Sequence, residues 1–156
     1  MVFLTKDGFK VRMCHEHMAQ HTDVIQYLDE AIGSVEVKSR RFVKIHVDMG
    51  RVIGKTACVT TDETDEIVYA VRVGRPGETR FVKNREMQPS SHVALIMQKQ
   101  GSEYKLVTAF VGKVAERELF DKSLRTEAER HVAEKFWANH ALVWGSQEIE
   151  CTTKNW

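Results

Sequence analysis

The sequence predicts an α+β fold in which a mainly antiparallel sheet of four or more strands packs against two principal helices. Several runs alternate apolar with polar residues and are separated by short turns, which favours antiparallel pairing because parallel strands need longer crossovers. Two longer segments, residues 22–32 and 121–139, place apolar residues at helical spacing. The chain has 156 residues, of which 42% are hydrophobic and 29% charged, so we expect one domain over residues 1–156.

The amino-terminal residues predict a strand pair followed by a helix. Residues 2–4 and 9–13 are short apolar runs separated by an Asp-Gly turn, which is typical of a hairpin. A helix is expected over residues 22–32, where Thr22 can cap its first turn and Gly33 can end it. Its apolar stripe should lie against the sheet.

The middle of the chain supplies most of the sheet. Strands are expected over residues 41–47, 67–73, 79–83, 92–98 and 104–111. We expect residues 75–112 to form the central sheet, with a hairpin connection at Gly101. Residues 67–73 are apolar at nearly every position, which predicts a strand buried on both faces.

The carboxy-terminal third predicts a long helix, capped by Asp121 or Ser123. Four apolar residues recur at every fourth position and predict its core-facing ridge: Leu124, Ala128, Val132 and Phe136. Residues 141–144 are expected to add an edge strand, and residues 152–156 to be loosely ordered.

Four cations fall within eleven positions of the sequence: Arg75, Arg80, Lys83 and Arg85. The net charge of +1 does not by itself indicate nucleic-acid binding, but a local positive field can attract an anion. Arginine and lysine side chains suit phosphate oxygens. The alternative is that these charges protect an edge strand from pairing with other chains.

Three further polar residues are candidates for chemistry. His46 lies on the polar side of a strand with Lys44 as its neighbour, where an imidazole can exchange a proton near neutral pH, or where it is simply a surface histidine. Thr108 interrupts an apolar strand, with Leu106 and Phe110 expected on its own face, although threonine is also a good strand residue. His140 follows a helix end, where it can bond the last carbonyls or supply a second imidazole to a site.

A metal site is weakly indicated near the start of the chain. His17 and His21 have the i,i+4 spacing that binds zinc on a helix, and His15 lies close by, but a third ligand and a positioned glutamate are not evident. A solvated or capping cluster is the alternative. The three cysteines show no CxxC spacing, so we expect no metal and no cofactor. Free thiols, no apolar leader and no run of membrane-spanning length predict a cytoplasmic protein without a membrane partner.

The order of these features resembles the barnase–EndoU–colicin–RelE superfamily of ribonucleases, particularly its phage and polymorphic-toxin branches. The resemblance covers residues 42–144, and residues 1–21 have no counterpart in it. It rests on His46 and on residues 79–83, 89–91, 108–112 and 136–143. It implies metal-independent cleavage of RNA by attack of the 2′-hydroxyl on the adjacent phosphorus, with RNA and an immunity or regulatory protein as partners.

The resemblance also implies a role for each candidate. His46 is the base and His140 the acid, while Arg80 and Thr108 stabilise the phosphate. Three more cations would bind substrate: Arg75, Lys83 and Arg85. We therefore expect His46, Arg80 and Thr108 to converge on one groove with Lys83 at its rim. The alternatives are a non-catalytic RNA- or protein-binding domain, and a metal enzyme that uses the three amino-terminal histidines.

Overall fold

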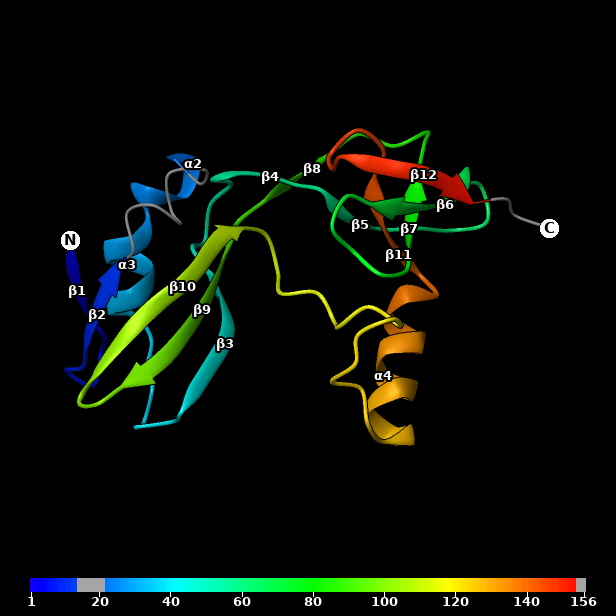
Figure 1. The fold of residues 1–156 in the computed structure, drawn as a ribbon. Helices are drawn as coiled ribbons and strands as arrows, with labels where there is room; N and C mark the ends of the chain where they lie inside the picture. The colour runs from blue at the N-terminus through cyan, green and yellow to red at the C-terminus, as the bar shows by residue number, and fades with distance from the viewer. Residues whose placement is uncertain (14–21, 154–156) are drawn as a thin grey trace. The chain divides into compact units, whose positions relative to one another are not determined.

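In the computed structural model, which describes residues 1–13 and 22–153, the chain forms two compact units (Figure 1). The first unit comprises Met1–Thr56 and Pro89–Val114, and the second comprises Ala57–Gln88 and Ala115–Trp156. The chain passes between the units three times, so each unit is built from two separate stretches of sequence. The expectation of one domain over residues 1–156 stays a prediction.

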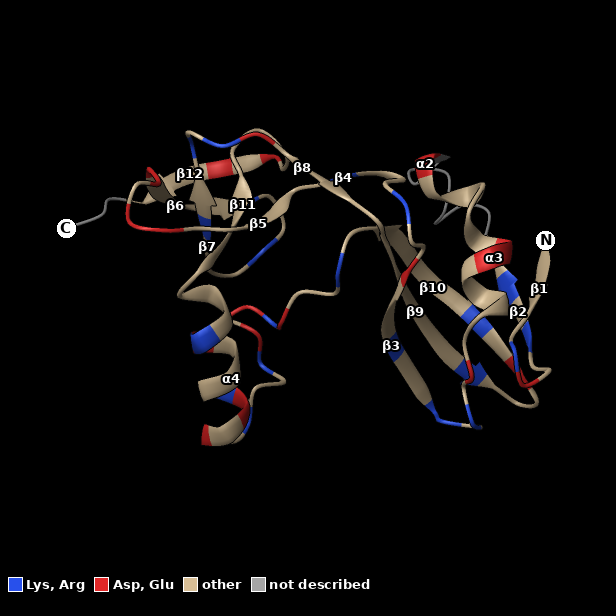
Figure 2. Ribbon diagram, turned by 180° about the vertical axis from the view of Figure 1, so that it is seen from behind, with Lys and Arg blue, Asp and Glu red and all other residues tan. Residues whose placement is uncertain are grey.

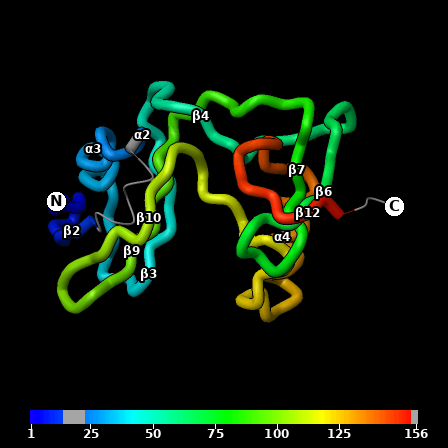
Figure 3. Tube along the Cα trace, turned by 45° about the horizontal axis from the view of Figure 1, so that its top comes forward, coloured from blue at the N-terminus to red at the C-terminus, as the bar shows by residue number. Residues whose placement is uncertain are grey.

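The first unit contains a five-stranded sheet of order β1-β2-β10-β9-β3. Its strands are β1 (Val2–Leu4), β2 (Lys10–Met13), β3 (Phe42–Asp48), β9 (His92–Gln100) and β10 (Glu103–Val111). All neighbouring pairs are antiparallel except β2 and β10, which are parallel. The mainly antiparallel α+β class predicted from alternation is therefore confirmed. The hairpin at Gly101 is confirmed as well, since this glycine has a φ of 64° and connects β9 to β10 (Figure 3).

One face of this sheet is covered by two short helices, α2 (Thr22–Ile25) and α3 (Leu28–Gly33) (Figure 1). Val24, Leu28 and Ile32 are fully buried against sheet residues such as Leu95, as expected of the stripe. The single helix expected over residues 22–32 is wrong, however. The Tyr27 amide bonds the Val24 carbonyl three residues back, and this tighter turn separates α2 from α3.

Three hydrogen bonds to the Asp7 carboxylate fix the loops around this core. The Asp7 carboxylate accepts hydrogen bonds from the Thr5 hydroxyl and from the amides of Val37 and Lys38. Burial acts to raise the pKa of Asp7, but these bonds outweigh it and bring the pKa to about 2. Asp7 therefore holds the turn between β1 and β2 to the loop that follows α3.

The second unit contains another five-stranded sheet, of order β12-β6-β7-β11-β5. Its strands are β5 (Cys58–Thr60), β6 (Ile67–Arg72), β7 (Glu78–Val82), β11 (His140–Val143) and β12 (Ile149–Thr153). Only β7 and β11 pair in parallel. The central sheet expected over residues 75–112 is therefore wrong, because β7 pairs with β6 and β11 and does not join the sheet of β9 and β10. A separate two-stranded sheet pairs β4 (Gly54–Thr56) with β8 (Gln88–Ser90).

The helix of the second unit, α4 (Glu127–Trp137), is shorter than the predicted helix over residues 121–139. Thr126 caps it by accepting from the Glu129 amide, and the Glu129 carboxylate accepts from the Thr126 hydroxyl. The expected cap Asp121 instead closes a local turn with Ser123.

The buried side of α4 also differs from the predicted ridge. Ala133 and Trp137 are buried, whereas Val132 is 51% exposed and Ala128 is exposed. The helix therefore faces its sheet through a stripe shifted by one residue from the one expected. The small apolar residues on the ridge did not identify the buried face, which is set by where the indole of Trp137 packs.

The carboxy-terminal strands correct two further expectations. Residues 141–144 are not an edge strand, because β11 lies between β7 and β5. Of residues 152–156, which were expected to be loosely ordered, Thr152 and Thr153 instead belong to β12 and pair with β6, and residues 154–156 lie outside the described residues. Among residues 1–13 and 22–153, we find no helix with the length and apolar character needed to cross a bilayer.

Candidate functional site

The candidate functional site lies on the side of the first sheet that faces away from α2 and α3. Val43, Ile45 and Val47 of β3 point toward the core, so Lys44, His46 and Asp48 project from the opposite side. The register pairs His46 with Ala94 and Asp48 with His92. His46, Asp48 and His92 therefore occupy neighbouring positions on one face.

These three side chains form a cluster of titratable groups. The rings of His46 and His92 meet edge to face, with their centroids 5.5 Å apart. His92 Nε2 lies 3.9 Å from a carboxylate oxygen of Asp48, so a protonated His92 would form an ion pair there. The Ser91 hydroxyl lies 3.5 Å from His92 Nδ1. We call His46, Asp48, Ser91, His92 and Lys113 the histidine cluster.

The surroundings of His46 favour its neutral form. Burial lowers the pKa of its imidazole, and the positive charges of His92 and Lys113 lower it further. The backbone N–H of Val114 donates to His46 Nδ1 at 3.4 Å. We infer that the neutral ring carries its proton on Nε2, which is then a hydrogen-bond donor toward a ligand.

Asp48 responds to the same neighbours in the opposite direction. The Gly50 amide and the Ser91 hydroxyl donate hydrogen bonds that lower the pKa of the Asp48 carboxyl, and the charges of His92 and Lys113 lower it further. The cluster therefore combines a fixed negative charge, a neutral imidazole and a second imidazole on a single sheet face, with the charge of Lys113 acting on His46 and Asp48.

Thr108 reaches this face because of a β-bulge. The register of β10 against β9 slips between Leu106 and Thr108, so Leu106 pairs with Met97 while Thr108 pairs with Ile96. Leu106 is buried in the core, and the extra residue turns Thr108 to the side of His46. The expectation that Leu106 shares the face of Thr108 is therefore wrong. Thr108 lies two strand spacings across the sheet and two residues along it from His46, which is roughly 12 Å between their Cα atoms.

Arg80 lies on β7 in the second unit and is held by neutral groups. Its Nη1 donates to the Thr61 hydroxyl at 2.7 Å and to the His140 carbonyl at 2.9 Å. These bonds connect β7 to residues at the ends of β5 and β11. Arg80 therefore acts as a structural link between strands, whatever else it binds.

The other predicted cations differ in how far their charge is compensated. Arg85 donates to both carboxylate oxygens of Asp65, at 3.1 and 3.2 Å, and the Asp65 side chain is only 2% exposed. The Lys83 ammonium lies 5.3 Å from the centre of the Trp144 ring, a cation–π contact. Arg75 is exposed in the turn after β6. Figure 2 shows acidic and basic positions mixed on α4 and on the loops of this unit.

His140 contacts a carbonyl at the end of α4, which is one of the two roles expected for it from the sequence. Its Nδ1 lies 2.8 Å from the carbonyl of Phe136, four residues earlier, and its ring stacks on that of Phe136 with centroids 3.9 Å apart. Because a carbonyl only accepts, Nδ1 carries a proton and the lone pair of the neutral ring is on Nε2. His140 thus bonds a terminal helix carbonyl, and it keeps one nitrogen for other partners.

The structure brings the seven predicted site residues together in two groups. His46 and Thr108 share one sheet face of the first unit, and Arg80 joins His140 within the second. Three cations, Arg75, Lys83 and Arg85, also belong to the second unit. The convergence of His46, Arg80 and Thr108 on one groove stays a prediction.

Comparison with known proteins shows the fold alone. No family model matches the sequence, and no curated protein matches it. A conserved hypothetical protein from Toxoplasma gondii ME49, solved as a crystal structure, has a similar fold. Its TM-score is 0.57 at 9% identity, over 88% of this chain and 95% of that one.

Sequence reasoning missed His92, Asp48 and Lys113 as members of a site. The available signal was the register: an antiparallel pairing of residues 42–48 with 92–98 places His92 opposite Asp48. A histidine at the start of a strand does not indicate a site until the partner strand is known. Residue identity alone therefore did not distinguish His92 from any other histidine.

The amino-terminal histidines lie outside the described residues, so the metal alternative at His15, His17 and His21 stays a prediction. Across the part of the chain that the structure describes, no group of three or more His, Cys, Asp or Glu side chains has an arrangement that would hold a metal ion. The histidine cluster has three such side chains but only two imidazoles in ring contact, with the carboxylate beyond coordinating distance.

Proposed function

We propose that the chain is a metal-independent endoribonuclease-like domain whose proton-transfer groups are His46 and His92. The observation that carries the proposal is the contact of these two imidazoles on the outer side of a sheet, with Asp48 beside one and the charge of Lys113 acting on the other. Cleavage of RNA without metal needs one group to take a proton and another to give one.

The proposed reaction forms one bond and breaks one. The 2′-oxygen bonds to the adjacent phosphorus while the bond from phosphorus to the 5′-oxygen breaks. One imidazole takes the 2′-hydroxyl proton, and the other gives a proton to the departing 5′-oxygen. The products are a 2′,3′-cyclic phosphate and a 5′-hydroxyl. His46 is the natural acceptor because its lowered pKa leaves it neutral near pH 7.

The phosphate would be held by groups on the same sheet face. Lys113 and Lys44 supply positive charge, and the Thr108 hydroxyl supplies a donor further along the face. The roles that the family resemblance gives to Arg80 and His140 are separate predictions, since both belong to the second unit. The variants Arg80→Ala and His140→Ala test those roles independently of the histidine pair.

A specific observation favours a second candidate, an RNA-binding domain without cleavage. The Val114 amide occupies the lone pair of His46 Nδ1, so the ring has to lose that bond before it accepts a proton. In its resting form His46 presents Nε2–H, which suits a phosphate oxygen. In this reading the same residues bind RNA, and chemistry does not follow.

End-labelled RNA incubated with the protein in the presence of a chelator tests both candidates. The ribonuclease proposal expects products with 2′,3′-cyclic phosphate ends, and no cleavage of DNA, which lacks the attacking hydroxyl. His46→Ala and His92→Ala should each lower the cleavage rate by about a hundredfold or more. His131→Ala, an exposed histidine on α4, serves as the matched control and should cleave like the wild type.

The outcomes separate the two candidates. Unchanged cleavage in His46→Ala would remove the proposed mechanism. If RNA binds but no RNA is cleaved, the binding domain is the correct function. In that case Lys113→Ala should reduce the slope of log affinity against log salt by about 0.7, as expected for one lost contact to a single strand.

A further inference from the structure

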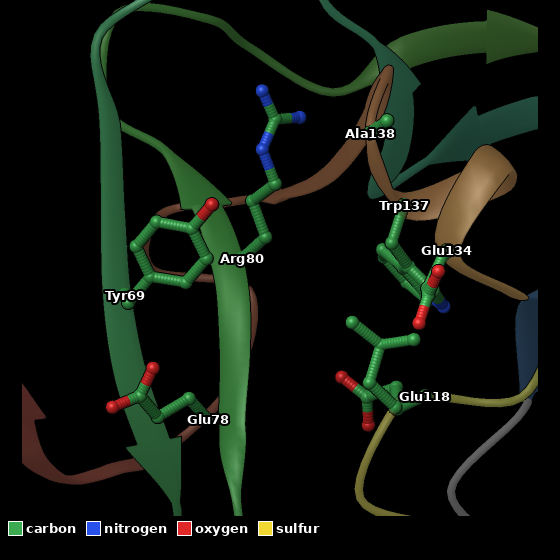
Figure 4. Close-up of a pocket in the computed structure, with 8 residues that line it drawn as sticks. Tyr69, Glu78, Arg80, Glu118, Glu134, Trp137 and Ala138 are labelled. Carbon is green, nitrogen blue, oxygen red and sulfur yellow. The ribbon is translucent and has the colours of Figure 1, made fainter. Parts of the chain in front are cut away.

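The second unit contains a pocket outside the histidine cluster, and one of its lining residues is Arg80, for which the family resemblance implies a phosphate-stabilising role. It has a volume of about 180 Å³. The pocket lies between the β6–β7 pair, the segment before α4 and the last turns of α4 (Figure 4). It is lined by Tyr69, Glu78, Arg80, Glu118, Leu119, Glu134, Trp137 and Ala138.

The walls of the pocket combine aromatic surface with carboxylates. Tyr69 and Glu78 stand on one side in Figure 4, and Trp137 and Glu134 stand on the other. The indole of Trp137 is fixed in place, because its N–H donates to the carbonyls of Glu116 and Arg117. A fixed aromatic ring beside negative charge is a favourable place for an organic cation.

The carboxylates differ in how much of their charge is compensated. Glu118 accepts hydrogen bonds from Arg72 and Thr79 and is therefore paired. The side chains of Glu78 and Glu134 have no hydrogen-bond or ionic partner within residues 1–13 and 22–153. The two unpaired carboxylates outnumber the one pocket cation, Arg80, whose guanidinium lies at the end away from Glu78 and Glu118 in Figure 4.

This charge balance selects against anions. Three carboxylates and one guanidinium line the pocket, and counting Arg72 behind Glu118 leaves an excess of one negative charge. Glu78 and Glu134 are both exposed residues, and a phosphate in the pocket would be repelled by their like charges. The volume also limits the ligand, since 180 Å³ is the space of about six water molecules and lies below the range of pockets that hold cofactors.

From this we propose that the pocket binds an organic cation of side-chain size, an alkylammonium or alkylguanidinium group whose stem packs on Trp137 and whose charge is met by Glu78 and Glu134. The source of the group is either a lysine or arginine side chain of a partner protein or a free small amine. Both sources present the same chemistry to the pocket.

Titration of the full chain with agmatine, followed by calorimetry and by tryptophan fluorescence, tests the proposal. Agmatine carries a guanidinium and an ammonium and no carboxylate, and 1-butanol serves as an uncharged probe with an alkyl stem. Agmatine should bind and 1-butanol should not, and added salt should weaken the binding. The double variant Glu78→Gln/Glu134→Gln should weaken agmatine binding by about tenfold or more.

A matched control and two further probes complete the design. Glu127→Gln removes an exposed carboxylate of α4 that does not line the pocket, so it should bind agmatine like the wild type. An arginine-containing peptide that binds tighter than agmatine would identify a protein side chain as the source, and equal or weaker binding would identify a free amine. The proposal is overturned by equal binding of 1-butanol, by an unchanged affinity in the double variant, or by a nucleoside monophosphate that displaces agmatine.

Discussion

The pair of Arg72 and Glu118 offers a quantitative test of how the second unit is held together. One carboxylate oxygen of Glu118 accepts from Arg72 and the other accepts from the Thr79 hydroxyl, while Arg72 Nε also donates to that hydroxyl at 3.1 Å. Thr79 is buried, and the side chains of Arg72 and Glu118 are only 14% and 15% exposed. The network ties β6 and β7 to the irregular segment before α4.

The expected loss of stability depends on which charged group remains buried without its partner after the substitution. Glu118→Ala leaves the Arg72 guanidinium and the Thr79 hydroxyl without their acceptor. Removing one partner of a buried pair costs roughly 3–5 kcal/mol, and because water reaches about a seventh of these side chains we expect about 2–3 kcal/mol. Glu118→Gln keeps an acceptor oxygen and should cost about 1 kcal/mol.

A double-mutant cycle isolates the interaction from the rest of the structure. Arg72→Met with Glu118→Ala should cost less than the sum of the single variants, because neither charge is then buried alone. Urea unfolding followed by tryptophan fluorescence measures each free energy, since Trp137 and Trp144 both lie in the second unit. Circular dichroism on the same samples follows the whole chain.

The exposed pair of Arg51 and Glu30 is the control, because both side chains are more than half exposed. Glu30→Ala should change the free energy of unfolding by no more than about 0.5 kcal/mol. A Glu118→Ala variant that loses no more than this control, or a cycle whose free energies simply add, would refute the reasoning.

Three further substitutions test the stability of the first unit. Asp7→Asn should lower stability at pH 7, and its difference from the wild type should disappear as the pH falls from 3.8 through the Asp7 pKa of about 2, measured by acid unfolding. Tyr104→Phe removes the 2.6 Å bond to the Arg40 carbonyl and should cost about 1 kcal/mol in urea unfolding. Gly112→Ala should lower the melting temperature, because φ is 124° and the new Cβ would lie 2.5 Å from Thr56 Oγ1.

The alternation of residue types predicted local features of the first unit correctly. His46 lies on the polar side of β3, the hairpin turns at Gly101, and the stripe of the amino-terminal helices packs on the sheet. These features depend on neighbours close in sequence. The period of two that defines a strand face is visible in any short window.

The placement of Thr108 illustrates how a local pattern misleads. Strict alternation puts Thr108 on the same face as Leu106, which is buried. The bulge in β10 adds one residue and reverses the face, so Thr108 lies on the side of His46 for a reason that the pattern does not contain. The bulge leaves both Leu106 and Ala109 buried in the core.

The division into two sheets depends on contacts that are distant in sequence. β7 pairs in parallel with β11, and Phe81 lies opposite Leu142. Alternation shows that a strand has two faces but does not show which strand is its partner. Residues 79–83 and the hairpin of β9 and β10 are close in sequence, and this closeness wrongly suggested one sheet.

The charged residues show the same dependence on distant partners. Arg85 is one of four cations close together in sequence, yet in the fold it pairs with the nearly buried carboxylate of Asp65. Arg80, another of the four, donates to the carbonyl of His140. A basic run in sequence therefore does not show how far each charge is compensated in the fold. The pair of His46 and His92 arises in the opposite way, since two histidines far apart in sequence, of which only His46 was a predicted site residue, become neighbours through the register of β3 against β9. Both the partners of Arg80 and the formation of the histidine cluster thus follow from strand pairing.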